Sequence, residues 1–376
     1  MLVKELFKIK KGKKAIESSE GVRYIQIEDL RNDYNIKYAL SNEKNVLCLK
    51  NDVLIAWDGA NAGTVGYNLE GVLGSTLAKL TPIDKKINTV YAGRFLQSKY
   101  QYLRNHCTGA TIPHISRPSL ENLQIPLPPL PEQKRIAAIL DEADKLRQLN
   151  TQLIEKYNAL TQSLFLEMFG DPVTNPKGWE VFKLKDITTK IGSGSTPKGG
   201  KESYKEEGIS LIRSLNIHDN FFKMKDLAFI DDIQAEKLKN VIIEKNDVLI
   251  NITGASVARC SIVPNEVLPA RVNQHVSILR CDDKKVNPLF LLHLLISPNC
   301  KLKLLGVGSS NGATREAITK EQLEKFQVIV PSIESQDQFE LKMISITQQK
   351  QQAEAALQKS EDLFNSLLQK AFKGQL

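Results

Sequence analysis

The stretch NDVLI occurs at residues 51–55 and again at residues 246–250. The two copies continue in register, because Gly59-Ala60 matches Gly254-Ala255 at the same separation of 195 residues. A polar turn followed by a short run of β-branched residues is typical of a buried strand that begins at a turn. The stretch therefore predicts the same strand twice, with its aspartate as a turn residue rather than as part of a repeated acidic site.

Further matches extend this repeat across both halves of the chain, and their separation grows stepwise from 187 to 203 residues. The matched segments are GVRYIQIEDL (21–30) with GISLIRSLNI (208–217), INTVYAGRFLQS (87–98) with VNPLFLLHLLIS (286–297), and LENLQIPLPPLPEQ (120–133) with LEKFQVIVPSIESQ (323–336). Small loop insertions in the second copy would produce these steps. An ordered series of this kind indicates a tandem duplication, and two copies form a pair rather than a repeat array.

Composition places the chain among folded proteins of more than one domain. It has 376 residues, of which 41% are hydrophobic and 25% charged, and this length is too great for one typical core. We find neither an apolar run of about 18 residues nor a signal-peptide core, so a cytoplasmic protein is expected. Five cysteines without a CxxC pair argue against a disulfide framework and against a zinc site.

The positive charge is concentrated in two large blocks. Residues 1–130 carry a net charge of +6 and residues 171–331 carry +4, whereas residues 131–170 and 332–376 each carry −1. Basic blocks are typical of proteins that bind polyanions. Because many soluble proteins are mildly basic, charge alone leaves nucleic-acid binding as one of two open alternatives.

Each repeat predicts a globular α+β block followed by a long helix. Short β-branched runs bounded by turns predict strands, and helical spacing at 89–103 and 288–305 predicts a helix between them. We expect blocks with a mixed, curved sheet, joined by two long antiparallel coiled-coil helices in a pseudo-two-fold arrangement. The expected division is 1–130 and 171–331 for the blocks, 131–170 for the central helix and 332–376 for the C-terminal helix.

A proline-rich connector, IPLPPLPEQ (125–133), separates the first block from its helix, because proline fixes φ and disfavours helix. Heptad spacing then predicts a coiled-coil stripe in both helices, so that each stripe is buried by the other. A polar Asn150 within the stripe would fix the register. The residues expected to pack are Ile136, Ile139, Leu146, Asn150, Leu153, Tyr157 and Leu160 in the first helix, and Phe339, Ile346, Leu363 and Leu367 in the second. Phe169, Leu164 and Leu160 near the helix end are expected in the core, with partner contact as the alternative.

The motifs of common enzymes are absent. The stretch GSGSTPKGGKES (192–203) departs from a phosphate-binding loop, since Ser195 replaces its first glycine and Glu202 follows Lys201. NPLF (287–290) lacks the second proline of an amino-methyltransferase motif and predicts a helix N-terminus instead. No histidine recurs in both repeats at the separations above. We therefore expect no catalytic residue, no bound cofactor and no metal in this chain.

Two basic blocks, each followed by a connector and a long helix, resemble the specificity (S) subunit of type I restriction–modification enzymes. The resemblance covers the whole chain, and its most specific parts are IPLPPLPEQKRIAAIL (125–140) and the repeated NDVLI with its following Gly-Ala. The second connector, VPSIESQ (330–336), departs from the proline-rich form. The resemblance implies two target recognition domains, each contacting one half of a bipartite, asymmetric DNA site.

The same resemblance implies the partners. The helices would set the spacing between half-sites and dock two modification (M) subunits, which carry S-adenosylmethionine and methylate adenine. Restriction (R) subunits would add ATP- and Mg-dependent cleavage. Two rival hypotheses remain open: a coiled-coil scaffold with two protein-binding heads, and a stand-alone DNA methyltransferase.

Candidate DNA-binding residues follow from side-chain chemistry. Lysines contact phosphates, whereas arginine, asparagine and glutamine distinguish base edges. In the first block the candidates are Lys10, Lys11, Lys13 and Lys14 for phosphate and Arg23, Gln26, Asn61 and Thr64 for bases. In the second block they are Ser195, Thr196, Lys198 and Lys201 in the parallel loop and Arg213, Arg259, Asn273 and Gln274 for bases. A solvated surface position is the alternative for each of them.

Overall fold

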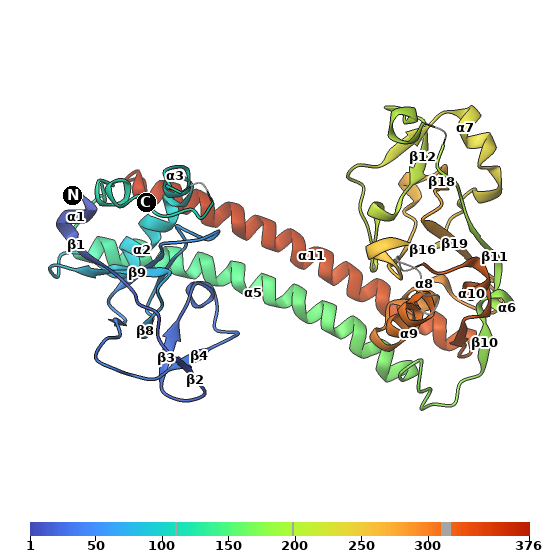
Figure 1. Ribbon diagram of the computed structural model, residues 1–376, viewed down its shortest axis with the longest axis horizontal. Coiled ribbons are helices and arrows are strands. Elements are labelled where there is room, and N and C mark those ends of the chain that lie inside the picture. The colour runs from blue at the N-terminus through green and yellow to red at the C-terminus, as the bar shows by residue number, and fades with distance from the viewer. Residues whose placement is uncertain (110, 198, 310–316) are drawn as a thin grey trace. The chain divides into compact units, whose positions relative to one another are not determined.

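The computed structural model describes residues 1–109, 111–197, 199–309 and 317–376 (Figure 1). The chain forms two compact units, residues 1–152 with 353–376 and residues 153–352. Two long helices, α5 (Leu130–Phe169) and α11 (Ile333–Phe372), each contribute one half to either unit. Each unit therefore contains one globular block and a piece of both helices.

The first block is built on two small sheets. One has the order β1-β9-β6-β7 and is antiparallel throughout; the other has the order β2-β4-β3-β8-β5, with β3 and β8 parallel. The strands are β1 (Phe7–Lys11), β2 (Glu17–Ser18), β3 (Val22–Ile25), β4 (Lys37–Ala39), β5 (Leu47–Cys48), β6 (Val53–Ala56), β7 (Val65–Tyr67), β8 (Gly71–Leu73) and β9 (Leu77–Pro82). The helices are α1 (Val3–Leu6), η1 (Glu28–Leu30), α2 (Thr89–Ser98), α3 (Tyr100–Asn105) and α4 (Arg117–Glu121).

The second block repeats this plan with additions. Its main sheet has the order β11-β19-β16-β17, and its second sheet, β15-β12-β18, again contains a parallel pair, β12 with β18. The strands are β10 (Val181–Lys183), β11 (Thr188–Ser193), β12 (Ile209–Ile212), β13 (Ile217–His218), β14 (Phe221–Phe222), β15 (Ala228–Ile230), β16 (Val248–Asn251), β17 (Cys260–Ile262), β18 (Ala270–Val272), β19 (Val276–Cys281) and β20 (Gln327–Ile329). The helices are α6 (Leu184–Ile187), η2 (Gly200–Ser203), η3 (Ser214–Asn216), α7 (Asp232–Lys237), η4 (Lys239–Val241), η5 (Gly254–Ser256), η6 (Asn265–Val267), α8 (Pro288–Ile296), α9 (Pro298–Ser309) and α10 (Lys320–Lys325).

The shared topology confirms the duplication and the α+β class. In both blocks the Val-Leu-Ile of the repeated NDVLI lies in one of the two inner strands of the main sheet, β6 or β16. The carboxylate of the NDVLI aspartate accepts the backbone N–H of the residue three positions earlier. The donors are Leu49 for Asp52, at 2.9 Å, and Glu244 for Asp247, at 2.8 Å. Both carboxylates are buried and ion-paired, with Lys79 and Arg280 respectively. They are structural turn residues, as the sequence predicts.

A buried glutamine fixes the start of each long helix to its own block. Gln133 accepts the backbone N–H of Asn88 at 2.9 Å and donates to the carbonyls of Lys86 and Pro128. Gln336 repeats the pattern by accepting from Asn287 at 2.8 Å and donating to Lys285 and Pro331. Both N–H groups and the oxygen of each amide are hydrogen-bonded inside the protein, so the connector and helix are held in one orientation.

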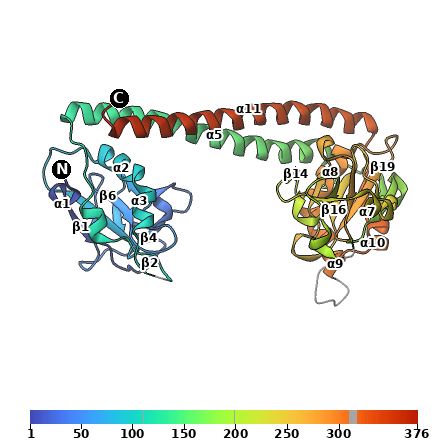
Figure 2. The same ribbon diagram turned by 90° about the horizontal axis from the view of Figure 1, so that it is seen from above.

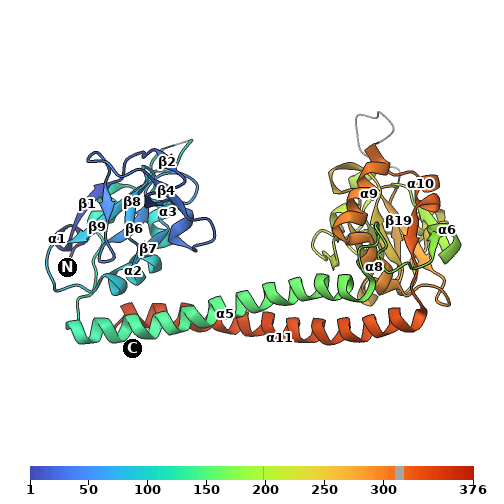
Figure 3. The same cartoon turned by 90° about the horizontal axis from the view of Figure 1, so that it is seen from below.

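The far end of each helix completes the block of the other repeat. In the first unit, Phe372 of α11 packs on Tyr91 and Phe95 of α2, with ring centroids 5.3 and 5.2 Å apart. In the second unit, Phe169 of α5 packs on Phe290 of α8 at 4.8 Å. Figure 3 shows α2 and α8 on the side of each block that faces the helices. Phe169 is fully buried and Leu164 packs half-buried against the same core, which confirms the core assignment for these two residues. For Leu160, which is 47% exposed, the assignment is wrong.

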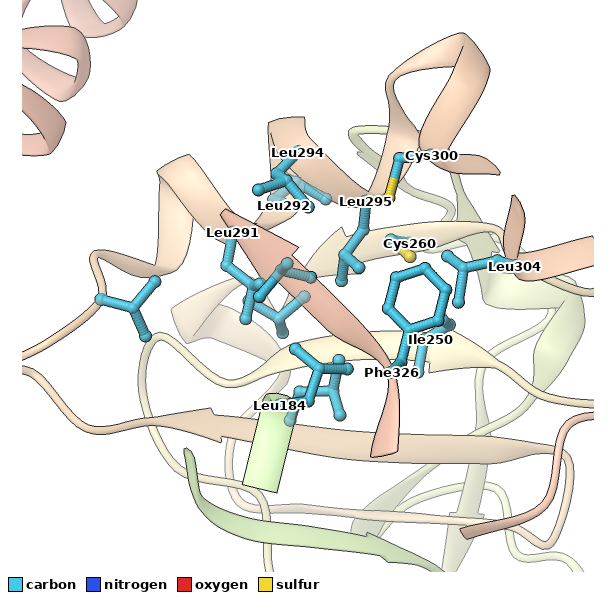
Figure 4. Close-up of a cluster of buried hydrophobic side chains, with 14 of the residues drawn as sticks. Leu184, Ile250, Cys260, Leu291, Leu292, Leu294, Leu295, Cys300, Leu304 and Phe326 are labelled. Carbon is cyan, nitrogen blue, oxygen red and sulfur yellow. The ribbon is translucent and has the colours of Figure 1, made fainter. Parts of the chain in front are cut away.

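The second block has a large aliphatic core around α8. Leu291, Leu292, Leu294 and Leu295 of this helix belong to one buried cluster with strand residues such as Ile250 (Figure 4). Among the described residues no single helix is long and apolar enough to span a membrane, although the bent pair Pro288–Ile296 and Pro298–Gly308 meets the length and composition test. Cys260 and Cys300 lie in the same core, where burial raises the pKa of the Cys300 thiol to about 12.

The two helices run antiparallel within each unit. In the first unit Arg135 donates to the carbonyl of Leu376 at 3.0 Å, and Asn150 donates to Ser360 Oγ at 3.3 Å (Figure 2). The polar register contact expected of Asn150 is thereby confirmed. In the second unit the rings of Phe165 and Phe339 meet at 5.7 Å.

Part of the predicted stripe is wrong. Leu146, Leu153, Leu160 and Leu363 are 46, 39, 47 and 47% exposed. The residue after each of them is more buried: Phe364 after Leu363 is buried, and Arg147, Ile154 and Thr161 are half-buried. Leu140, which follows the predicted Ile139, is likewise fully buried. Ile136 and Phe339 are buried, Asn150, Tyr157, Ile346 and Leu367 are half-buried in the seam, and Ile139 is half-buried on the other flank.

The globular blocks explain this one-residue rotation. Helix α5 must contact α2 as well as α11, since Arg94 of α2 forms ion pairs with Asp141 at 2.7 Å and Asp144 at 2.9 Å. Leu140 belongs to the core of the first block. A heptad pattern describes packing against one partner helix only. Because α5 packs against both α11 and α2, its buried face is shifted by one residue relative to the predicted stripe.

The same position of the two repeats joins block to helix by different chemistry. Arg94 of α2 is ion-paired, whereas its counterpart, His293 of α8, packs edge-on against Phe339 at 5.4 Å. His293 Nε2 is buried and has no hydrogen-bond partner among the described residues. Burial lowers the pKa of His293 to about 4.

This buried histidine predicts an acid-sensitive second unit. Its pKa is lower in the folded than in the unfolded chain, so the unfolded state binds the proton first as the pH falls below about 6.5. When the pH is lowered from 7 to 4.5, the free energy of unfolding of the wild type should fall by about 2 to 3 kcal/mol more than that of His293→Leu. Urea denaturation at the two pH values measures this difference. An identical pH dependence in the two proteins would contradict this assignment.

Candidate nucleic-acid interface

Four segments of the first block meet at one end of its main sheet, where β1 and β6 end and β9 begins. Main-chain hydrogen bonds hold these segments together. We call residues 11–14, 57–64, 74–76 and 108–115, without Ala110, the first edge. Gly12 N–H donates to Leu77 O at 2.9 Å, Trp57 to Thr76 O at 2.8 Å, and Gly59 to Pro113 O at 2.9 Å. The side chains of these segments are therefore not needed to assemble the edge.

The second block has the same construction, and we call residues 193–197, 252–259, 273–275 and 317–318 the second edge. Gly194 donates to Asn273 O at 3.1 Å, Ile252 to His275 O at 2.9 Å, and Ile318 to Ile252 O at 2.8 Å. Close approach of the chains requires glycine in both copies. A Cβ on Gly12 would lie 2.1 Å from Gly74 O, and one on Gly194 would lie 1.8 Å from Val272 O.

The first edge carries charged side chains. Lys11 and His114 both contact Asp58, with Nζ–Oδ2 and Nδ1–Oδ1 distances of 2.5 and 2.6 Å. Partial burial raises the pKa of Asp58, but the hydrogen bonds from Lys11 and His114 outweigh this effect and lower it. Lys10, Lys13 and Lys14 are exposed beside this cluster, as phosphate contacts require.

A residue that the sequence analysis missed connects two of the predicted base contacts. Arg31, exposed after η1, donates to Asn61 Oδ1 at 2.8 Å and to Thr64 Oγ1 at 3.3 Å. Its counterpart at a separation of 187 residues is His218, which lies 3.4 Å from Arg259, the counterpart of Thr64. In each repeat these two positions are in contact and one of them is an arginine, but the arginine is the first of the pair in the first repeat and the second of the pair in the second repeat. Aligning the repeats position by position could have identified Arg31 as a candidate.

Arg23 lies on β3 and Gln26 just after it, where Gly74 of the first edge donates its backbone N–H to Ile25 O at 2.9 Å. Arg23 is balanced by two carboxylates, Asp29 at 2.7 Å and Asp33 at 2.5 Å. Gln26 donates to Glu17 at 3.2 Å. A contact from Arg23 to a base would therefore require the loss of an internal ion pair.

Arg213 follows β12 at the position equivalent to Gln26. Its guanidinium lies 5.2 Å from the ring centroid of Tyr204 and donates to the carbonyl of Asp226. The Nε atom is buried without a partner among the described residues. Stacking on an aromatic ring holds the fork in a defined plane, which suits bidentate contact with guanine.

The second edge contains no lysine or carboxylate, and it carries Arg259 together with the polar residues Thr196, Gln274 and His275. Thr196 donates to Gln274, which is exposed, and Gln274 lies 3.1 Å from the His275 ring. Asn273 is buried and accepts the backbone N–H of His275 at 3.0 Å, so it shapes the turn rather than facing outward. Ser195 and Lys201 are exposed, and Lys198 lies outside the described residues.

The two cofactor-like stretches have structural roles. Residues 200–203 form the short 3-10 segment η2, and strand β12 follows, whereas a phosphate-binding loop leads into an α-helix. Asn287 caps α8 by accepting the N–H of Leu289 at 2.9 Å, as the sequence predicts. Within the described part of the chain, no group of three His, Cys, Asp or Glu residues is placed to hold a metal.

Comparison with known proteins decides the family. A family model described as "Type I restriction modification DNA specificity domain" matches residues 1–159 and 176–355. The chain belongs to this family. The two matched segments coincide with the two repeats, which confirms the resemblance seen in the sequence.

Relatives of this specificity family cover nearly the whole chain. The MjaVIII specificity subunit of a type I restriction enzyme from Methanocaldococcus jannaschii is 27% identical over 364 residues, covering 91% of this chain and 84% of that protein. The EcoBI specificity subunit from Escherichia coli is 26% identical over 391 residues, covering 95 and 80%.

Solved structures share the fold. The S subunit of the type I restriction-modification system from M. genitalium has a TM-score of 0.61 at 18% identity, covering 99% of this chain and 95% of that one. A chain from a structure on complex assembly and conformational transition of the type I R-M system has a TM-score of 0.60 at 17% identity, covering 100 and 97%. These similarities support the α+β fold assignment.

The placement of Arg213 generates a test. Replacing Arg213 with Ala should reduce discrimination at one base pair of one half-site by about 1 to 3 kcal/mol, since a bidentate contact is lost. Binding to duplexes that differ at single positions measures this change. Equal weakening on all duplexes would instead assign Arg213 to a phosphate.

Proposed function

We propose that this chain is the DNA sequence-recognition subunit of a type I restriction–modification complex, in which each edge contacts one half of a bipartite, asymmetric site. The observation that carries the proposal is the same main-chain edge built twice with different side chains. The first edge has Lys11, Asp58 and His114, whereas the second has Thr196, Gln274 and His275. Different side chains on the same scaffold favour two unlike half-sites.

Electrostatics supports DNA as the ligand. The net charges of +6 and +4 lie on the blocks, and exposed lysines flank the first edge. Phosphate contacts of this kind supply affinity that falls with salt, and base contacts supply the sequence preference. A coiled-coil scaffold with two protein-binding heads would need neither feature.

The long helices are proposed as spacer and docking platform. Each helix is continuous between the two units, since α5 includes residues 130–169 and α11 includes 333–372. A helix without a break transmits a fixed rise per residue, so it would hold the gap between half-sites constant.

Docking is supported by apolar residues that the seam leaves exposed. Leu146, Leu149, Leu153 and Leu160 of α5 are 39 to 51% exposed. Leucines that recur at heptad spacing on an uncovered helix face are suited to packing against further helices. We assign them to two modification subunits, which would bring S-adenosylmethionine and methylate adenine.

Catalysis is assigned to the partners. In this proposal the chain binds no cofactor, and restriction subunits add ATP- and Mg-dependent cleavage to the complex. A stand-alone methyltransferase would instead methylate DNA from S-adenosylmethionine without any added subunit.

DNA selection tests the proposal. The chain, assembled with its modification partner, should select from randomised duplexes two unlike half-sites at a fixed gap. The variant Lys13→Ala/Lys14→Ala should bind all duplexes more weakly. The slope of log K against log salt concentration should become shallower by about 0.9 for each phosphate contact that is lost. Selection of no sequence by the wild type would overturn the proposal.

The docking face can be tested separately. The double change Leu153→Ser/Leu160→Ser should weaken binding of the modification subunit and alter unfolding free energy by less than about 0.5 kcal/mol per site, because both side chains are exposed. The control Leu140→Ala removes a buried side chain and should cost about 2 to 5 kcal/mol of stability. Retention of full partner affinity by the double variant would exclude this face.

A further inference from the structure

Gln274 occupies the most exposed point of a tightly held turn on the second edge. The turn 273–275 connects β18 to β19, and Asn273 anchors it by donating its backbone N–H to Ile212 O at 3.1 Å. The flanking residues Asn273 and His275 are buried or half-buried, whereas Gln274 is exposed. The fold therefore presents this one side chain outward.

Both ends of the Gln274 amide are held by neighbours. Thr196 donates its hydroxyl to Gln274 Oε1, and Gln274 Nε2 lies 3.1 Å from His275 Nε2. His275 Nδ1 in turn lies 2.5 Å from Thr253 Oγ1. An amide nitrogen can only donate, so His275 Nε2 accepts and His275 Nδ1 donates to Thr253.

This chain of hydrogen bonds fixes which way the amide faces. With the oxygen toward Thr196 and the nitrogen toward His275, each contact pairs a donor with an acceptor. Exchanging the two atoms would place the amide oxygen against the lone pair of His275 Nε2, so that two acceptors would face each other unless the imidazole took its other tautomer. The Thr253 hydroxyl, 2.5 Å from His275 Nδ1, is able to accept the Nδ1 proton of the required tautomer. His275 thereby determines the orientation of Gln274.

After these contacts the amide still has one N–H and one oxygen lone pair available. A neighbouring donor and acceptor on one planar group match adenine in the major groove, where N6 donates and N7 accepts. A side chain already held in one rotamer also loses less freedom on binding than a mobile one. In the major groove, adenine is the base whose donor and acceptor match this geometry with two hydrogen bonds.

The first edge lacks this arrangement at every position. By the main-chain hydrogen bonds that align the two edges, Ser75 stands where the second edge has Gln274, and Thr76 where it has His275. Asp58 replaces Thr253. Adenine recognition of this kind is thus confined to the second half-site.

We propose that Gln274 contacts an adenine in the half-site bound by the second block, and that His275 is its positioning residue. This inference rests on the proposed function as a DNA-recognition subunit. It adds one base identity and the residue pair responsible for it.

The test uses the chain in complex with its modification partner and a randomised duplex library. The wild type should require adenine at one position of the second half-site, and Gln274→Ala should reduce that preference about 5- to 150-fold. All other positions, including the whole first half-site, should be unchanged, which also shows that the variant is folded. The matched control Ser75→Ala should keep the adenine preference intact.

A modified base tests direct contact. Replacing the selected adenine with 7-deazaadenine removes the N7 acceptor and should weaken wild-type binding, with little further effect on Gln274→Ala. His275→Ala should lower the same single preference, whereas His275→Gln should restore most of it, since its carbonyl can accept from Gln274. A purely structural role of His275 would alter many positions together and would overturn the positioning assignment.

The outcomes separate the two proposals. If the wild type selects a bipartite site and Gln274→Ala selects the same one, adenine recognition by Gln274 is excluded while the DNA-recognition function stands. If the wild type selects no sequence, both fail.

Discussion

The packing of Phe372 against Tyr91, and of Phe169 against Phe290, is the contact on which the rest of the molecule depends. Each ring belongs to the helix of one repeat and completes the core formed by the other. Neither repeat therefore has a complete core by itself. Gln133 and Gln336 fix the near end of each helix by hydrogen bonds, so a helix is tied to one block at its start and to the other at its end.

This arrangement explains how the recognition surface of the protein is held in a defined geometry. The cores and the glutamines hold the blocks on the helices, and main-chain hydrogen bonds hold the edges. Charged and polar side chains at the edges are then free to face a ligand. Asn273 of the second edge is an exception, because its side chain accepts the backbone N–H of His275.

The sequence predicted those features that depend on local pattern or on repetition. The strand after each NDVLI, the cap at Asn287 and the register contact of Asn150 follow from short-range chemistry. The rotation of α5 could not be predicted, because Ile139 and Leu140 are equally apolar and only the contact with α2 distinguishes them. The pairing of Arg23 with Asp29 and Asp33, and the position of Arg31 beside Asn61, depend likewise on loop geometry that no periodicity encodes.

The main-chain construction of the edges also bears on how such a protein changes over time. A substitution at Ser75 or Gln274 breaks none of the main-chain hydrogen bonds that hold the turn, and both side chains are exposed. Exposed positions of this kind alter folding free energy little. New DNA preferences can therefore arise by single substitutions in either block independently. Such substitutions hardly change the stability of the fold, so selection for stability does not remove them.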